Sequence, residues 1–209
     1  MTGPQKVWYA SYGSNILESR FRCYIAGGKP EGATRTYKGC RDKTLPEDKE
    51  QIIISSEVYF ARSAKTWNGG GVAFIKNNFD EHHQTLGRMY LISQEQFEDV
   101  VRQEIGTEEP LEIDFDLVSE MGNLVVKPDS WYGNIIFLGK SRGHPIFTFT
   151  SDTDLLDQLN MPNQHYLRTI SKGLREAYGY SDSELINYFQ KLSGIKGTAM
   201  ESEVGRMIK

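Results

Sequence analysis

The sequence predicts an α+β fold in which a curled sheet or an open, mixed β-barrel is flanked by helices. Three observations lead to this class: a strand–turn–helix unit opens the chain, strand patterns fill its middle, and helical periodicity dominates its last third. The 209 residues are enough for one generous domain and few for two. We expect one domain over residues 1–195 and a loose tail over residues 196–209, where periodicity is weak.

The opening unit consists of a strand, a glycine-containing turn and a helix. An apolar and aromatic run over residues 7–12 predicts the strand, which breaks at Gly13-Ser14-Asn15. Apolar residues at helical spacing follow over residues 17–24. Backbone N–H groups at such a helix start can bind a carboxylate, a phosphate or a developing oxyanion. Ser14 or Asn15 could equally serve only as the N-cap of the helix.

The middle of the chain is rich in predicted strands. A polar and charged stretch over residues 38–51 predicts a solvated loop before them. Strand patterns follow over residues 52–60, 71–75, 86–92, 111–118, 131–138 and 146–149. Acidic and apolar side chains alternate in residues 111–118, which indicates a strand with one solvated face rather than a functional acidic cluster.

Capping signals locate the helices. Ser93 with Gln96 forms a capping box, so we expect a helix over residues 94–104. Ser181 with Glu184 forms a second box and predicts a helix to about residue 192. Helical patterns also cover residues 151–159 and 163–178, the second of them ended by Gly179.

Glu104 is the strongest catalytic candidate. Phe97, Val100 and Val101 form an apolar helix face, and Glu104 continues their spacing. We therefore expect its carboxylate on the buried face near the C-terminal end of the helix, where burial and the helix dipole both disfavour the charged form. Both effects raise a carboxyl pKa, which suits a general acid or base near neutral pH. The alternative is a frayed helix end that turns Glu104 to solvent.

The remaining candidates each have a plain structural explanation beside the functional one. The glycines at 69–71 either let the backbone approach a ligand or form a tight connection into a strand. Arg20 and Arg22 could assist an anionic ligand or face water. His82 and His83 are adjacent in a polar stretch, a spacing that does not favour a metal site.

Composition excludes several function classes. The net charge of −4 gives no electrostatic reason to expect nucleic acid or an anionic membrane as a partner. No apolar run approaches the roughly 20 residues that span a bilayer. Two cysteines are too few for a disulfide scaffold or a zinc finger, and no signal-peptide pattern is present. We therefore expect a soluble, cytoplasmic protein without a metal.

Five segments, in order along the chain, resemble the γ-glutamylcyclotransferase-like family, including its γ-glutamylamine cyclotransferase-like members. They are residues 8–16 (WYASYGSNI), 66–75 (TWNGGGVAFI), 87–92 (GRMYLI), 102–104 (RQE) and 162–174. The first resembles the family's opening strand and Tyr-Gly-Ser-Asn loop, and the fourth ends on Glu104, in the place of the catalytic Glu. Ile16 stands where Leu is usual, and the family pattern does not explain the charged loop over residues 38–51.

The resemblance implies a fold, a reaction and a set of site residues. The fold is the γ-glutamylcyclotransferase-like mixed, open β-barrel with flanking helices. The reaction releases 5-oxoproline from a γ-glutamyl amine or γ-glutamyl amino acid, by attack of the α-amine on the γ-carbonyl of the same molecule, with Glu104 as general acid/base and no cofactor. The implied substrate-binding residues are Tyr12, Gly13, Ser14, Asn15, Gly70, Gly71 and Tyr132. The leaving group and the oligomeric state, monomer or homodimer, stay open.

Two other kinds of function also stay open. A non-catalytic module that binds a small molecule or regulates another protein could keep the family pocket, although the retained Glu104 argues against it. The charged loop over residues 38–51 and the C-terminal helices could instead form an interaction surface.

Overall fold

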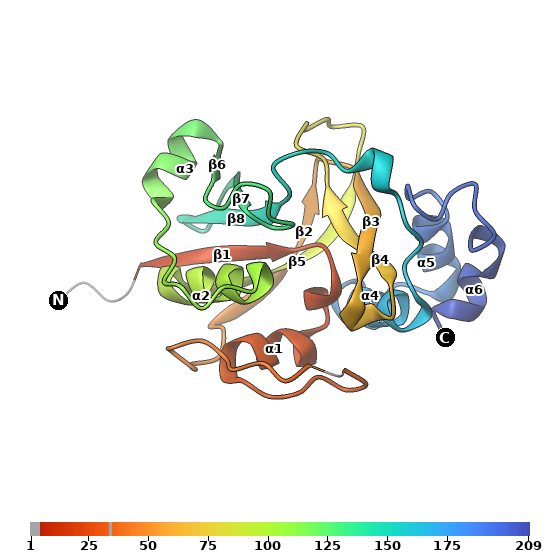
Figure 1. Ribbon diagram of the computed structural model, residues 1–209, viewed down its shortest axis with the longest axis horizontal. Helices are drawn as coiled ribbons and strands as arrows, with labels where there is room; N and C mark the ends of the chain where they lie inside the picture. The colour runs from red at the N-terminus through yellow and green to blue at the C-terminus, as the bar shows by residue number, and fades with distance from the viewer. Residues whose placement is uncertain (1–4, 34) are drawn as a thin grey trace.

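Six strands form one mixed sheet at the centre of the molecule (Figure 1). The computed structural model describes residues 5–33 and 35–209. Across the sheet the strands are β2 (Asp48–Ile54), β5 (Thr85–Ser93), β1 (Lys6–Ser11), β8 (His144–Thr150), β7 (Asn134–Ser141) and β6 (Asn123–Val125). β1 pairs antiparallel with β5 and parallel with β8, and the sheet is not closed. The predicted α+β class with an open, mixed sheet is confirmed.

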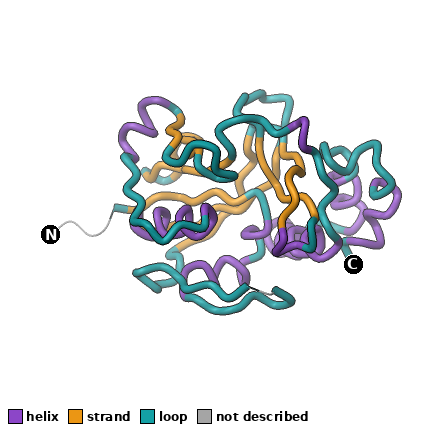
Figure 2. The backbone as a smooth tube through the Cα atoms, viewed as in Figure 1, coloured by secondary structure: helices purple, strands orange, loops and turns teal. Residues whose placement is uncertain are grey.

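β1 lies in the interior of this sheet and is buried on both faces. Because side chains alternate along a strand, Val7 and Tyr9 enter one core while Trp8 and Ala10 enter the other. Helices α1 (Glu18–Ala26), α2 (Gln94–Ile105) and α3 (Phe115–Met121) cover the first core. The second core contains the two-stranded sheet of β3 (Val58–Ala64) and β4 (Gly70–Ile75) together with α4 (Gln164–Tyr178) and α5 (Asp182–Phe189). Figure 2 shows the strands enclosed between these two sets of helices.

Helices α2, α4 and α5 begin where the sequence predicts. The Ser93 and Ser181 capping boxes are both formed, at the starts of α2 and α5. α4 begins after Asn163, whose side chain accepts a hydrogen bond from the backbone N–H of Tyr166, and it ends at Gly179. α5 ends at Phe189, three residues before the predicted end. The helix expected over residues 151–159 is wrong, since only the short 3-10 turn η3 (Leu156–Gln158) forms there.

The strand predicted over residues 111–118 is also wrong. The Asp114 side chain accepts a hydrogen bond from the N–H of Leu117 and so caps α3. Phe115 and Val118 are the buried residues of α3, and they lie three positions apart, which is a helical spacing. The alternation of acidic and apolar residues was therefore compatible with a capped helix as well as with a strand.

Residues 52–60 form two strands in two different sheets rather than one. β2 ends at Ile54 and β3 begins at Val58, after a tight turn. β2 also begins at Asp48, so the last four residues of the predicted loop 38–51 are paired with β5. The other predicted strands of the middle region correspond to β4, β5, β7 and β8, whereas the short edge strand β6 was not predicted.

The C-terminal segment packs on the core instead of forming a loose tail. Residues 196–209 contain the turn η4 (Glu201–Glu203) and the helix α6 (Val204–Met207). Val204 and Ile208 are fully buried in the core that contains α4 and α5. Within residues 5–33 and 35–209, no helix has the length and apolar character that crossing a membrane requires.

Candidate active site

The turn at residues 12–15 carries the chain from the end of β1 into α1. After Gly13 the chain forms a 3-10 turn, η1 (Ser14–Ile16), and α1 follows. α4 packs directly against this junction. A Cβ atom added to Gly173 would lie 2.5 Å from the backbone N of Leu17, so a glycine is needed for the two backbones to approach this closely.

Two side chains of β5, Tyr90 and Arg88, form hydrogen bonds with the backbone of the turn. The Tyr90 hydroxyl lies 2.9 Å from the carbonyl oxygen of Asn15 and 3.1 Å from that of Ile16. The Arg88 guanidinium donates to the Ile16 carbonyl at 3.0 Å and pairs with Glu176 at 3.1 Å. The buried carbonyl groups of this short turn are thereby satisfied, which favours one fixed conformation.

A cavity of about 160 Å³ lies beside the turn. Of the residues expected from the sequence, its wall contains Tyr12, Gly13, Ser14, Asn15, Glu104 and Tyr132. The wall also contains further aromatic and cationic residues, namely Tyr9, Arg20, Tyr24, Arg35, Tyr37, Trp67, Trp131, Phe149 and Tyr166. The fold thus brings the N-terminal turn next to the end of α2, 89 residues later in the chain.

The predicted substrate-binding glycines Gly70 and Gly71 are not in the cavity wall. A Cβ atom at Gly71 would lie 2.1 Å from the carbonyl oxygen of Asn160, and one at Gly70 would lie 2.5 Å from the backbone N of Asn163. Because these glycines have no side chain, residues 160–163, which lead into α4, can pack directly against their backbone. The expectation of close backbone approach is correct, but the approaching group is the protein's own chain.

Glu104 lies in the last turn of α2, is half-buried and lines the cavity. The Asn15 side-chain amide donates to its Oε1 at 3.2 Å. Burial raises the pKa of the Glu104 carboxyl above its ordinary value. The hydrogen bond with the Tyr24 hydroxyl and the positive charges of Arg20 and Arg35 lower this pKa, but by less than burial raises it. A carboxyl group whose pKa is raised is better suited than an ordinary one both to accept and to return a proton.

Arg20 lies on the cavity wall, whereas Arg22 is exposed. The Arg20 guanidinium is 4.8 Å from the centre of the Trp67 ring, an arrangement suited to a cation–π contact. It donates to the Ser14 hydroxyl at 3.0 Å and to the Tyr37 hydroxyl at 2.8 Å. No carboxylate of the described residues forms an ion pair with Arg20. The cavity therefore contains a buried cation that can bind an anion.

Three tyrosines form hydrogen bonds with backbone groups of β4 and β8 around the cavity. Tyr12 donates to the Phe149 carbonyl at 2.8 Å, and Tyr132 donates to the Ala73 carbonyl at 3.1 Å. The Tyr166 hydroxyl accepts from the Ala73 N–H at 3.1 Å. Burial raises the pKa of Tyr166 to about 12 and also raises the pKa values of the other two, so all three stay neutral at physiological pH.

Asn15 has one side-chain polar atom without a hydrogen-bond partner among the described residues. Its amide Nδ2 donates to Glu104 at 3.2 Å and lies 3.4 Å from the Tyr9 hydroxyl. Its Oδ1 is buried without a hydrogen-bond partner in the part of the chain that the structure describes. A buried acceptor normally has a donor, so this oxygen is suited to accept an N–H from a bound molecule. The start of η1 also lacks a side-chain cap, which leaves backbone N–H groups beside the cavity.

Sequence reasoning missed several aromatic and cationic residues of the wall. Tyr37 and Arg35 come from the irregular segment after α1, and Trp67 comes from a 3-10 turn between β3 and β4. No periodicity places such residues, so only tertiary contacts could reveal them. Across residues 5–33 and 35–209, no group of three or more His, Cys, Asp or Glu side chains is arranged to hold a metal ion.

Two solved structures are similar to this fold. A structure described as a gamma-glutamyl cyclotransferase superposes with a TM-score of 0.53 and 14% identity, covering 98% of each chain. The crystal structure of an uncharacterised protein from Homo sapiens superposes with a TM-score of 0.52 and 15% identity, again covering 98% of each chain. At these identities the likeness concerns the fold alone. No family model matches the chain.

A curated plant protein is similar in sequence. "Histone deacetylase 5" of Arabidopsis thaliana is 35% identical over 207 aligned positions, which cover 88% of this chain. The chain spans 30% of the length of that relative. The similarity therefore concerns one segment of a longer protein.

Proposed function

We propose that this protein releases 5-oxoproline from a γ-glutamyl amine or γ-glutamyl amino acid, as a cyclotransferase. The observation that carries the proposal is Glu104, a carboxyl group of raised pKa that shares the cavity with the Tyr12–Asn15 turn. The fold likeness to a γ-glutamyl cyclotransferase supports it. A cytoplasmic location and the absence of a cofactor belong to the same proposal.

In this reaction the substrate supplies both the nucleophile and the electrophile. The α-amine attacks the γ-carbonyl carbon, the new C–N bond closes a five-membered lactam, and the amide bond to the leaving amine breaks. The α-ammonium must first lose a proton, which Glu104 accepts. Glu104 then returns a proton to the leaving nitrogen. Both protons that the ammonium loses end on the leaving amine, which departs as an ammonium, so no oxidant or reductant is needed.

The other cavity residues bind and orient the substrate. Arg20, which lacks a carboxylate partner in the described chain, suits the substrate's α-carboxylate. The unpartnered Oδ1 of Asn15 suits the α-amine, next to the proton acceptor. Backbone N–H groups at the start of η1 suit the oxyanion that develops on the γ-carbonyl. Holding the chain of the substrate in a folded geometry supplies much of the rate, since the attack is intramolecular.

The test is a substrate panel with two matched variants. Purified protein is incubated with γ-glutamyl amino acids, γ-glutamyl amines and glutathione, and 5-oxoproline is measured by mass spectrometry. Glu104→Gln removes the proton acceptor with little change in shape. Glu98→Gln is the control, because Glu98 lies on the same helix, is also half-buried and also has a raised pKa, but does not line the cavity.

We expect product from the wild type and from Glu98→Gln, and loss of product in Glu104→Gln. Normal turnover in Glu104→Gln would exclude the proposed role of Glu104. If no substrate yields 5-oxoproline although the protein is folded, the cyclotransferase proposal fails.

A second candidate function is a ligand-binding module without turnover. The similarity to a segment of a longer plant protein named as a histone deacetylase favours it, because such a segment can serve another part of the same chain. This function predicts that γ-glutamyl compounds or 5-oxoproline bind, measured by isothermal titration calorimetry, while no product forms. Turnover with any member of the panel would decide against it.

A further inference from the structure

A second cavity of about 160 Å³ lies on the other side of Arg20. It is formed by the start of α1, the loop at residues 30–32 and the first half of α4. Arg20 belongs to the walls of both cavities. The cyclotransferase proposal does not use this second cavity.

The second cavity has an excess of positive charge. Arg168 and Lys172 of α4 line it together with Arg20. The single carboxylate in its wall is Glu31, which is 3.8 Å from Lys172 but whose side chain is 92% exposed, so water screens its charge strongly. Neither Arg168 nor Arg20 forms an ion pair with any carboxylate in the described ranges.

One nitrogen in this cluster is buried without a partner. The Nε atom of Arg168 is inaccessible to solvent and forms no hydrogen bond within residues 5–33 and 35–209. Leaving a buried donor of a charged group unpaired costs free energy. Because this Nε has no accessible surface, a bound acceptor would reach it only after the Arg168 side chain reorients.

The start of α1 adds donors of the same kind. Leu17 is the N-cap of this nine-residue helix and provides no side-chain acceptor, and Leu17 and Ser19 both line the cavity. The first N–H groups of an uncapped helix carry a partial positive charge and bind anions. Two separate features therefore point to the same chemistry: the cation cluster and the uncapped helix start.

We propose that this second cavity binds a phosphate-type oxyanion, either free phosphate or the phosphate group of a phosphomonoester. Arg168 and Lys172 supply the charge, and the start of α1 supplies backbone donors. Because Arg20 is shared, the bound anion lies next to the cavity that contains Glu104.

His165 offers a direct readout, because it lines the second cavity. Burial lowers the pKa of the His165 imidazole, and the three cations Arg20, Arg168 and Lys172 lower it further, while Glu31 acts in the opposite direction. An anion bound among these cations offsets their effect. The pKa of His165 is therefore expected to rise when the cavity is occupied.

The experiment follows the four histidines by NMR in the intact chain. Chemical shifts are recorded during pH titrations with inorganic phosphate, with O-phosphoserine and with chloride at matched ionic strength. We expect phosphate or O-phosphoserine to raise the pKa of His165 and to leave His82, His83 and His144 unchanged. A tighter effect of O-phosphoserine assigns the site to a phosphomonoester, and an effect of inorganic phosphate alone assigns it to the free ion.

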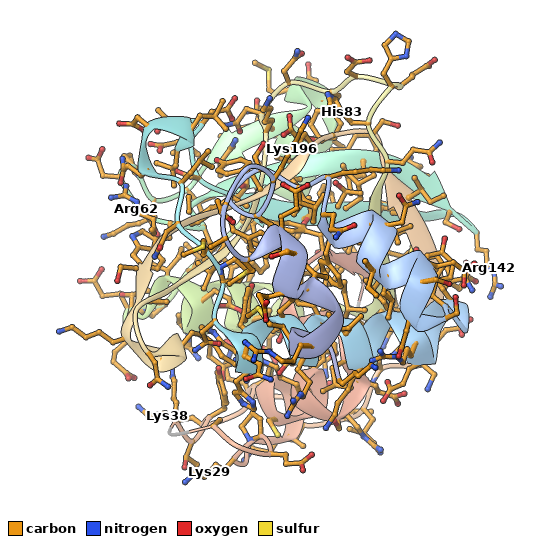
Figure 3. All side chains as sticks on the ribbon, turned by 90° about the vertical axis from the view of Figure 1, so that its right-hand side faces the viewer. Lys29, Lys38, Arg62, His83, Arg142 and Lys196 are labelled. Carbon is orange, nitrogen blue, oxygen red and sulfur yellow. The ribbon has the colours of Figure 1, made fainter. Side chains whose placement is uncertain are left out.

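Two variants and a control locate the binding. Arg168→Gln and Lys172→Gln are each expected to weaken anion binding about tenfold. Lys196→Gln is the control and is expected to bind as the wild type does. Figure 3 shows Lys196 in the upper part of the molecule, far from Lys29, which lies at the bottom beside the loop at residues 30–32.

The proposal is overturned if chloride shifts His165 as much as phosphate does, or if both α4 variants, shown to be folded by circular dichroism, keep wild-type affinity. None of these measurements uses turnover. The result is therefore independent of whether 5-oxoproline is formed at the first cavity.

Discussion

Tyr90→Phe tests whether β5 holds the active-site turn. The substitution removes one hydroxyl group that lies 2.9 Å from the Asn15 carbonyl and 3.1 Å from the Ile16 carbonyl. Ile16 keeps the Arg88 guanidinium as a donor at 3.0 Å, so the carbonyl of Asn15 is the group that loses a buried partner. A buried acceptor left unpaired costs about 1–3 kcal/mol.

This cost can be measured as a change in thermal stability. For a chain of this size, 1 kcal/mol corresponds to about 2–4 °C in Tm. We therefore expect Tyr90→Phe to lower Tm by about 2–12 °C in circular dichroism. We also expect slower release of 5-oxoproline, because the carbonyl that loses its donor belongs to Asn15, whose side chain bonds to Glu104.

Tyr180→Phe is the matched control. Tyr180 is half-buried against the other core, the one that contains α4 and α5, and its hydroxyl has no hydrogen-bond partner in the described part of the chain. Its removal is therefore expected to leave Tm and turnover unchanged. If Tyr90→Phe melts at the wild-type temperature, the hydroxyl contributes nothing to the turn. The argument that β5 fixes the turn would then be refuted.

Three further predictions concern Glu104, Gly71 and Asp114. Because burial raises the pKa of Glu104, the folded state binds the proton more tightly than the unfolded state, so the wild type loses stability as pH rises through and above the ordinary carboxyl range. The Tm of Glu104→Gln, measured from pH 4 to pH 8, should therefore rise relative to that of the wild type as pH rises. A difference in Tm that stays constant over this range would contradict the prediction. Gly71→Ala, whose Cβ would lie 2.1 Å from the Asn160 carbonyl, should lower the free energy of unfolding by about 1–3 kcal/mol in urea; wild-type stability would contradict the close contact. Asp114→Ala should lower the free energy of unfolding by about 0.5–2 kcal/mol in the same assay, because α3 loses its N-cap. An unchanged free energy of unfolding would favour the strand that the sequence suggested.

Elements fixed by local chemistry could be predicted from the sequence. The capping boxes at Ser93 and Ser181 involve residues three positions apart, so no knowledge of the rest of the fold is needed to find them. The position of Glu104 on the cavity follows in the same way, because helical spacing places it on the face of Phe97 and Val101. Its catalytic role stays a prediction.

Features set by contacts between distant segments could not be predicted. The segment before β2 has no periodicity, yet it contributes Tyr37, which binds Arg20 beside the cavity. Gly71 signals a close approach, but the sequence does not say whether a ligand or the Asn160 backbone approaches. At Asp114 the same residues suit a strand by alternation and a helix by capping, and packing of Phe115 and Val118 in the core decides for the helix.

The position of β1 between β5 and β8 has a consequence for how the protein folds. Among the described residues β1 is the first strand and its parallel partner β8 is the last, and Tyr12, directly after β1, bonds to Phe149, 137 residues later. Pairing over such a separation is slow, and β1 exposes apolar side chains on both faces until it is complete.

A chain that ends at residue 110 would therefore contain Tyr12, Asn15 and Glu104 but could not assemble the cavity. It would lack β8 beside β1, and it would also lack α4, whose Gly173 allows close packing against the turn. The proposed activity is thus expected only once β8 and α4 have packed against β1 and the turn that follows it.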